Sequence, residues 1–245
     1  MANQFNQPRV ALITGANKGI RFETARQLGR LGITVLLGAR DGKRGQRAAE
    51  TLRGEGLEAR PIVLDVTDQS TIDAAAVHIE REFGRLDILV NNAGIFIEKQ
   101  PASRCQLENL RRTFETNFFG AFAVTKALLP LLRKAEAGRI VNLASDLASL
   151  GNTSDPQWAL YEHVYFAYAS SKVAINAMTV ALAKDLRNTP IKVNSADPGF
   201  TATDMNGHTG PKKPEQAALV PVQLATLPPD GPSGGYFDEN GPVPW

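Results

Sequence analysis

The segment Val10–Ile20, which reads VALITGANKGI, decides the fold. Its first four residues form a short run that is apolar throughout, as expected of a strand covered on both faces. A threonine and a glycine follow, and apolar residues then recur at helical spacing from about Gly19 to Leu31. The segment therefore predicts a buried strand, a glycine turn and a helix, the opening unit of a parallel α/β sheet.

The same alternation of strand-like and helix-like segments continues along the chain without a linker. Further strands are predicted at Ile33–Leu37, Ile62–Leu64, Leu86–Val90, Arg139–Leu143, Ile191–Ser195 and Gly235–Phe237, and helices at Lys43–Arg53, from Thr67 onward, at Leu107–Leu132 and at Phe166–Arg187. The expected fold is a Rossmann-type doubly wound α/β domain, with a parallel sheet of about seven strands and helices on both faces. One domain is expected to span residues 1–245.

Composition excludes several other classes of protein. Hydrophobic residues make up 43% of the chain, charged residues 21%, and the net charge is +2, with no dense basic stripe for nucleic acid. The single cysteine, Cys105, rules out an internal disulfide and has no catalytic motif around it. Residues 1–8 are polar, and no apolar run has the length of a membrane helix. We therefore expect a cytoplasmic protein without a membrane partner.

The glycine turn after the first strand is a candidate phosphate-binding loop. Backbone N–H groups and the positive end of a helix dipole can approach a pyrophosphate at such a turn. The alternative is a plain strand-to-helix turn. The candidate cofactor-binding residues of the loop are Gly15, Asn17, Lys18, Gly19 and Ile20.

Charge at the end of the second strand indicates which dinucleotide the loop would take. Sites for the non-phosphorylated cofactor usually place an acid there to bind the ribose 2′-OH, whereas this chain has Ala39 followed by Arg40. Arg40 and Lys18 are suited to a 2′-phosphate, although either can be a surface charge and Asp41 can partly neutralise Arg40. The pattern favours NADP(H).

Tyr168 and Lys172 are spaced i, i+4 and so lie on one face of a helix. A phenol has a pKa of about 10, and an adjacent ammonium favours its ionised form. Taken alone, such a pair is more often structural than catalytic. Other motifs in the chain favour a catalytic role for this pair. They occur together with it in one order along the chain: Thr14-Gly15 with Gly19, Asn91–Gly94, Asn117, Ser145 and Pro198-Gly199.

This ordered set resembles the short-chain dehydrogenase/reductase family over nearly the whole chain. Gly15–Ile20, Thr203–Met205 and Gly241–Trp245 resemble its carbonyl-reductase-like members. The resemblance implies that Tyr168 protonates the substrate carbonyl oxygen while hydride arrives from the nicotinamide. It further implies that Lys172 lowers the pKa of Tyr168 and binds the nicotinamide ribose, that Ser145 orients the carbonyl, and that Asn117 holds a water linking Lys172 to solvent.

The resemblance also implies further cofactor contacts. Asp65 and Val66 would contact the adenine, and Asn91, Ala93 and Gly94 would line the adenine and ribose side. The contacts at the nicotinamide would come from Pro198, Gly199, Thr201 and Thr203, with the following segment acting as a mobile substrate lid. No metal site is expected, because His163 has no cluster of partner ligands.

The chain departs from the family pattern at two places. Arg21 stands where a third loop glycine is usual. It either adds a phosphate contact, crowds the pyrophosphate, or is a variant or engineered change, and we favour weakened or reorganised cofactor binding. The second departure is the 23 positions between Ser145 and Tyr168, wider than is typical. The surplus, about residues 150–164, contains Trp158, Tyr161 and His163, and either lines the substrate pocket or packs as a surface loop.

The leading functional hypothesis is an NADPH-dependent carbonyl reductase that reduces ketones or aldehydes reversibly, with Tyr168 as general acid. The alternatives are an NAD-dependent secondary-alcohol dehydrogenase and a non-catalytic dinucleotide sensor. The surplus segment favours a monomer or dimer over a tetramer. Substrate specificity is expected from Ile95–Lys99, Leu147–His163 and Met205–Thr209, the segments whose geometry the sequence determines least.

Overall fold

The computed structural model describes residues 8–163 and 165–245 and contains one sheet of eight strands in the order β3-β2-β1-β4-β5-β6-β7-β8. All neighbouring pairs are parallel except β7 and β8. The strands are β1 (Val10–Thr14), β2 (Thr34–Ala39), β3 (Ala59–Val63), β4 (Ile88–Asn91), β5 (Arg139–Leu143), β6 (Lys192–Ala196), β7 (Tyr236–Asp238) and β8 (Gly241–Pro242).

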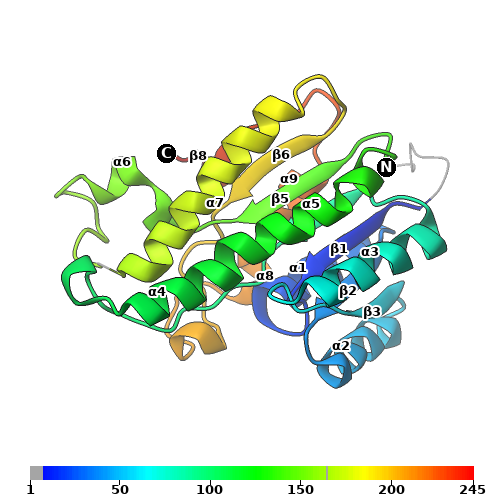
Figure 1. Cartoon of the computed structure of the whole chain (residues 1–245), viewed down its shortest axis with the longest axis horizontal. Helices are drawn as coiled ribbons and strands as arrows, with labels where there is room; N and C mark the ends of the chain where they lie inside the picture. Colours follow the sequence, from blue (N-terminus) through cyan, green and yellow to red (C-terminus); the bar gives the residue numbers. More distant parts are fainter. Residues whose placement is uncertain (1–7, 164) are drawn as a thin grey trace.

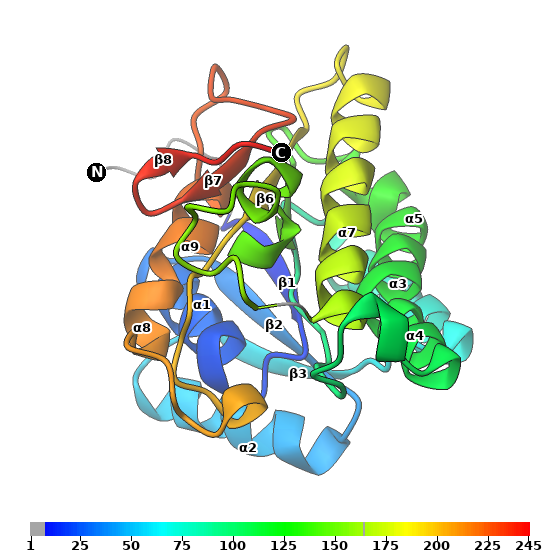
Figure 2. The ribbon, with the colours of Figure 1, turned by 90° about the vertical axis from the view of Figure 1, so that its left-hand side faces the viewer.

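Helices cover both faces of this sheet (Figures 1 and 2). One face carries α1 (Gly19–Arg30), α2 (Gly42–Gly54), α8 (Pro214–Ala217) and α9 (Leu219–Ala225). The other carries α3 (Gln69–Phe83), α4 (Leu107–Phe114), α5 (Gly120–Leu132) and α7 (Phe166–Asp185). The short α6 (Leu150–Thr153) lies beside the C-terminus, where the Gly151 N–H donates to the Trp245 carbonyl at 2.7 Å. The doubly wound fold predicted from the sequence is confirmed.

The apolar character of the strands follows from this two-sided burial. Leu12 and Leu36 belong to the core beneath α3 and α5, whereas their neighbours Ile13 and Leu37 belong to the core beneath α1 and α2. Because successive side chains of a strand point to opposite faces, a strand between two helical layers must be apolar at every position. This is why unbroken apolar runs predicted the central strands.

The structure differs from the prediction at the sheet edges and inside one helix. Strand β3 begins at Ala59 rather than Ile62, because an edge strand is half exposed and tolerates Arg60 and Pro61. An eighth strand, β8, pairs antiparallel with β7 and was not predicted. The predicted helix 107–132 is interrupted by a π-helical turn at Glu115–Phe119. None of the helices in the described ranges is long and apolar enough to cross a membrane.

Buried polar side chains attach α5 and α7 to the sheet. The Asn91 amide nitrogen on β4 donates to the Thr125 hydroxyl of α5 and to the Asn142 side-chain oxygen of β5, both at 2.8 Å. Asn142 in turn donates to the Thr179 hydroxyl of α7 at 2.9 Å. Thr179 shares a hydrogen bond with the hydroxyl of Ser195 on β6 at 2.8 Å. This network fixes the position of both helices relative to the carboxyl ends of the strands, although the Asn91 side-chain oxygen within it has no hydrogen-bond partner among the described residues.

Candidate active site

The strand order reverses at β1, which pairs with β2 on one side and with β4 on the other. In open α/β sheets, the crevice beyond the carboxyl ends of the strands at this point is where ligands bind. The loop after β1 carries Gly15 and Gly19, and both have left-handed backbones with φ of +69° and +63°. Glycine is the residue that adopts this conformation without steric cost. The predicted phosphate loop therefore lies at the switch point.

The first turn of α1 leaves its backbone N–H groups available. Lys18, at the N-cap, makes no side-chain cap, and the first turn contains no acidic residue. Unpaired N–H groups and the helix dipole make this end of α1 suited to an anion. Asn17 and Ile20, also predicted as loop contacts, are partly exposed here.

Thr14 joins the loops that follow β1 and β4. Its hydroxyl accepts hydrogen bonds from the N–H groups of Asn92 and Ala93, each at 2.9 Å, and donates to the Val90 carbonyl at 3.4 Å. The end of β1 thereby determines the path of the chain after β4. Sequence reasoning missed this role, because it depends on two strands 76 or more positions apart meeting side by side.

The three residues predicted from the β4 loop have different surroundings. The Asn91 side chain points into the buried polar network, so only its backbone is available to a ligand. Ala93 and Gly94 are partly exposed. A Cβ placed on Gly94 would lie 3.3 Å from the Asn117 side-chain oxygen and 3.8 Å from the Lys172 nitrogen. Gly94 therefore leaves a bare backbone surface directly beside two predicted catalytic residues.

Asn117 lies in the π-helical turn and ties this loop to α7. Its side-chain oxygen accepts from the Ile95 N–H at 2.8 Å, and its amide nitrogen donates to the Ile95 carbonyl at 3.1 Å and to the Ser171 hydroxyl at 3.0 Å. π-turns inside α-helices are frequent at functional sites. Here the side chain has a structural role between the β4 loop and α7, and the water predicted from the resemblance stays a prediction.

Ser145 and Tyr168 meet at the carboxyl end of β5. The Tyr168 and Ser145 side chains form a hydrogen bond. The Ser145 hydroxyl also donates to an Asp146 carboxylate oxygen at 3.0 Å. The Tyr236 hydroxyl donates to the Ser145 carbonyl and so holds this residue from β7. Sequence reasoning missed Tyr236, although the predicted strand Gly235–Phe237 placed it in the sheet.

Tyr168 and Lys172 on α7 are surrounded by further charged groups. Lys172 is 5% exposed and donates to the Leu143 carbonyl at 2.5 Å. Burial and the nearby Arg21 cation lower the pKa of Lys172 to about 7, against the opposing charge of Asp197. Burial, with the Asp146 and Asp197 carboxylates, raises the pKa of Tyr168 above its ordinary value. The hydrogen bond from Ser145 and the charge of Arg21 lower it. Arg21 is therefore a second cation near Tyr168, in addition to Lys172, whose ammonium lies 5.7 Å from the centre of the Tyr168 ring.

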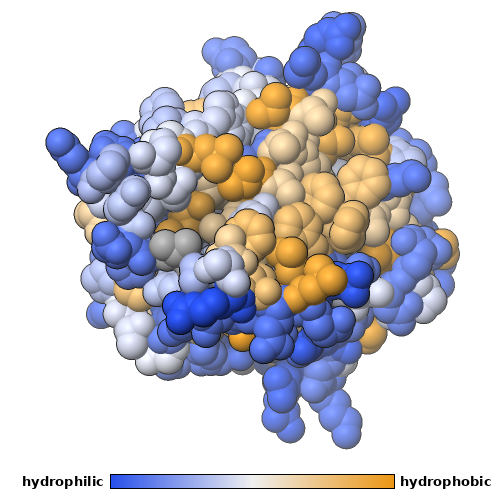
Figure 3. Space-filling model, turned by 60° about the vertical axis from the view of Figure 1, so that its left-hand side comes forward, coloured by the Kyte–Doolittle hydropathy of each residue, from blue (hydrophilic) through white to orange (hydrophobic). Residues whose placement is uncertain are grey.

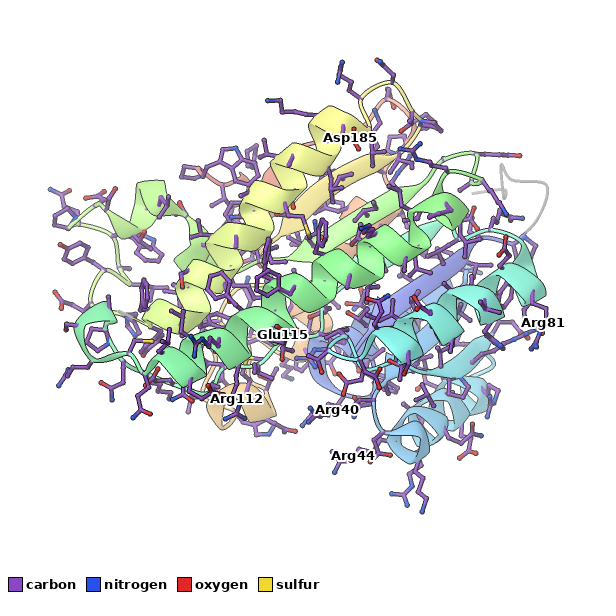
Figure 4. All side chains as sticks on the ribbon, in the orientation of Figure 1. Arg40, Arg44, Arg81, Arg112, Glu115 and Asp185 are labelled. Atoms are coloured by element: carbon purple, nitrogen blue, oxygen red, sulfur yellow. The ribbon has the colours of Figure 1, made fainter. Side chains whose placement is uncertain are left out.

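The cations predicted for a 2′-phosphate have different partners. Arg40 and Arg44 project from the end of β2 and the first turn of α2 (Figure 4). Asp41 caps α2 and pairs with Arg44 at 3.3 Å, and Arg40 is exposed with no carboxylate partner among residues 8–163 and 165–245. The Lys18 ammonium pairs with Asp204. Arg40 is therefore the freer of the two cations.

The remaining predicted cofactor residues lie on loops after β3 and β6. Asp65 accepts from the Thr67 N–H at 3.0 Å, and Val66 packs against α5 at Gly120. Pro198 and Gly199 follow β6, with Gly199 at φ +71° and its N–H donating to the Asp197 carboxylate at 2.8 Å.

The segment after Gly199 returns to the phosphate loop. Thr201 pairs with Lys212 in an isolated bridge. Thr203 begins a short turn and lies 3.7 Å from where a Cβ on Gly19 would be. Together with the ion pair between Lys18 and Asp204, this contact places the predicted substrate lid against the phosphate loop.

A cluster of aromatic side chains contacts Tyr168 through Phe96. The centre of the Phe96 ring lies 5.0 Å from the centre of the Tyr168 ring and 5.2 Å from that of Tyr165. The centres of the Tyr165 and His163 rings are 5.8 Å apart. Residue 164, within the surplus segment, lies outside the described residues. Tyr161 and His163 are exposed and Trp158 is partly so. Figure 3 shows apolar side chains gathered over one face of the molecule. Leu150, Tyr161 and Phe166, all in or next to the surplus segment, are exposed.

The described residues also include possible metal ligands and the thiol of Cys105. Within the described parts of the chain, no group of three His, Cys, Asp or Glu side chains is placed to hold a metal ion. The Cys105 thiol donates to Glu98 at 3.2 Å, and burial together with that carboxylate raises the pKa of the thiol. Cys105 therefore remains protonated and is a poor nucleophile.

Comparison with known proteins places this architecture in a family. Residues 9–214 match the family model described as short chain dehydrogenase. Mouse (Mus musculus) carbonyl reductase [NADPH] 1 is 35% identical, with 96% of this chain and 98% of the relative covered. Peppermint (Mentha piperita) (-)-isopiperitenone reductase is 33% identical, covering 94% of this chain and 96% of the relative. A short chain dehydrogenase of Shigella flexneri, solved in complex with NADP, is 28% identical with a TM-score of 0.82, and the match covers 94% and 96% of the two chains.

The chain belongs to the short-chain dehydrogenase/reductase family and is similar to its carbonyl-reductase-like members. It is an oxidoreductase of that family. The resemblance drawn from the sequence motifs is confirmed.

Proposed function

We propose that this protein is an NADPH-dependent carbonyl reductase that converts ketones or aldehydes to alcohols reversibly. The observation that carries the proposal is the meeting of Ser145, Tyr168 and Lys172 at the carboxyl end of β5, beside the bare backbone of Gly94. A proton donor, a hydrogen-bonding serine and a buried cation next to a dinucleotide crevice are the parts that carbonyl reduction needs.

The cofactor is NADP(H). Carbonyl reductase [NADPH] 1 and the NADP complex of the Shigella flexneri relative support this assignment. The chain's own residues fit such a group. Gly15, Gly19 and the uncapped N-terminus of α1 offer a cradle for a diphosphate. The end of β2 carries Ala39 instead of an acid, and the neighbouring Asp41 pairs with Arg44, which leaves the exposed Arg40 for a phosphate. The Arg21 side chain does not fit this cradle, because it packs on Gly15.

NADPH supplies the hydride when bound, and the residues around Tyr168 provide the rest. Ser145 donates a hydrogen bond to the substrate carbonyl oxygen and holds it next to the Tyr168 hydroxyl. Tyr168 then releases its proton to that oxygen, which becomes the alcohol. The buried Lys172 ammonium stabilises the tyrosinate that remains. Phe96 and Tyr165 favour a hydrophobic carbonyl compound, because their rings form the wall beside Tyr168.

A panel of aryl and aliphatic ketones, aldehydes and keto esters tests this proposal. The wild type is expected to consume NADPH, measured by its absorbance, with at least one hydrophobic carbonyl compound. Ser145→Ala is expected to consume NADPH much more slowly with the same compound. NADH at the same concentration is expected to support a lower kcat/KM. Binding of NADPH without turnover of any carbonyl compound would instead indicate the dinucleotide sensor, and preference for NADH in alcohol oxidation would indicate the NAD-dependent dehydrogenase.

A further inference from the structure

The Arg21 side chain lies across the backbone surface between Gly15 and Gly94. Its Nη2 donates to the Gly94 carbonyl at 3.2 Å. A Cβ placed on Gly15 would lie 3.0 Å from the Arg21 Nη1 and 3.2 Å from its Cδ, so the arginine packs directly on that glycine. The guanidinium thus covers the bare backbone that the two glycines leave at the ends of β1 and β4.

This surface lies between the two ends of the proposed cofactor site. Arg40, at the end of β2, marks the adenosine side, and Lys172 lies 3.8 Å from a Cβ placed on Gly94 at the other side. Loop glycines at a switch point allow the backbone to approach the cofactor closely, and a side chain packed on them removes that space. We infer that Arg21 is a side-chain gate, which occupies the middle of the cofactor site and must rotate away before the dinucleotide binds.

The contacts of Arg21 make it displaceable. Its guanidinium donates to one neutral carbonyl oxygen, and no carboxylate in the described ranges forms an ion pair with it. Lys172, a second cation, lies close enough for Arg21 to lower the pKa of its ammonium. A partly buried cation beside another cation, held by a single neutral acceptor, is weakly anchored. Rotation therefore costs a hydrogen bond but relieves the repulsion with Lys172.

The geometry also distinguishes a gate from a fixed phosphate ligand. An arginine that serves as a fixed phosphate ligand would leave the backbone of Gly15 open and would contact the phosphate from beside the loop. Arg21 instead lies on Gly15 itself. Removal of the side chain should consequently tighten cofactor binding, whereas removal of a phosphate ligand would weaken it. This prediction rests on the proposed function, because it requires that the chain bind NADP(H).

Titration of NADPH against the purified full chain, by ligand fluorescence or calorimetry, tests the gate. Arg21→Gly and Arg21→Ala are expected to lower the Kd roughly tenfold, because the cost of breaking the hydrogen bond to the Gly94 carbonyl is partly offset by the relief of repulsion with Lys172. Arg21→Met keeps the bulk without the hydrogen bond and is expected to fall between the wild type and Arg21→Ala. Circular dichroism and thermal melts establish that each variant is folded, and Arg21→Ala avoids placing a glycine in α1.

Arg81→Ala provides the matched control, since Arg81 is exposed near the carboxyl end of α3 (Figure 4) and should leave the Kd unchanged. An unchanged or higher Kd in both Arg21→Gly and Arg21→Ala would overturn the gate while leaving the proposed function intact. A comparable tightening in Arg81→Ala would also overturn it, because net charge would then explain the effect. Failure of the wild type and of all variants to bind NADPH would overturn the proposed function itself.

Discussion

Replacement of Thr14 by valine removes the hydroxyl that joins the loops after β1 and β4 while keeping the side chain's shape. Thr14 is 1% exposed, so the N–H groups of Asn92 and Ala93 lose their acceptor in a place that water reaches poorly. An orphaned buried donor costs about 1–3 kcal/mol. Because Ala93 is partly exposed and can recover part of the loss from solvent, we expect Thr14→Val to lower the free energy of unfolding by roughly 2–4 kcal/mol.

Urea denaturation followed by circular dichroism measures this effect as a shift in the transition midpoint at constant slope. Thr14→Ser is the control, because it keeps the hydroxyl and loses one methyl group, at a cost of about 1 kcal/mol. NADPH affinity should also fall in Thr14→Val, since Asn92–Gly94 loses its attachment to β1. Equal stability of the valine and serine variants would refute the role assigned to this hydroxyl.

Three further predictions concern packing, pH and cofactor choice. Gly120→Ala should destabilise the fold by about 1–3 kcal/mol, because the new Cβ would lie 2.7 Å from a Val66 methyl and 2.8 Å from the Val66 carbonyl oxygen. Gly54→Ala, which meets nothing within 4 Å, is its control in the same denaturation assay, and equal effects would contradict the packing argument. Burial and Asp146 raise the pKa of Asp197 to about 7. The folded state therefore binds the proton of this carboxyl group more tightly than the unfolded state, and the free energy of unfolding falls as pH rises from about 4 to 7. Asp197→Asn should therefore be more stable than the wild type at pH 8 and similar at pH 4 in thermal melts, and a constant difference would argue against this titration. Arg40→Asp should raise the Kd for NADPH about tenfold or more with little change for NADH, with Arg44→Asp as the control, whereas equal effects on both cofactors would exclude a 2′-phosphate contact.

The sequence predicted the central fold because two-sided burial demands apolar residues at every position of a strand. Prediction failed for elements that are exposed on one side or too short to show a pattern. Edge strand β3 carries Arg60 and Pro61, β8 is only two residues long, and α6, α8 and α9 have seven residues or fewer and too few turns to show a helical period. The single domain over residues 1–245 and the monomeric or dimeric state stay predictions.

The candidate site was predictable to the extent that its residues form ordered motifs. Tyr168, Lys172, Ser145 and Asn117 were identified in this way, and the structure brings them to one end of the sheet. Their partners were not predictable, because contacts such as Tyr236 with Ser145 and Lys18 with Asp204 join positions 91 and 186 apart in the chain. Arg21 was visible as a departure from the glycine pattern. Its effect on Lys172 and Tyr168 required the geometry, since it depends on how the long arginine side chain folds back over the loop.

Transfer of a labelled hydride tests the central claim most directly. With NADPH that carries deuterium at both C4 positions and a carbonyl substrate from the panel, the account predicts deuterium on the carbinol carbon of the product. Tyr168→Phe should bind NADPH with a similar Kd but lose the reaction about a hundredfold or more, the usual contribution of a general acid. Turnover by Tyr168→Phe at the wild-type rate, or a product without deuterium at that carbon, would contradict carbonyl reduction with Tyr168 as the proton donor.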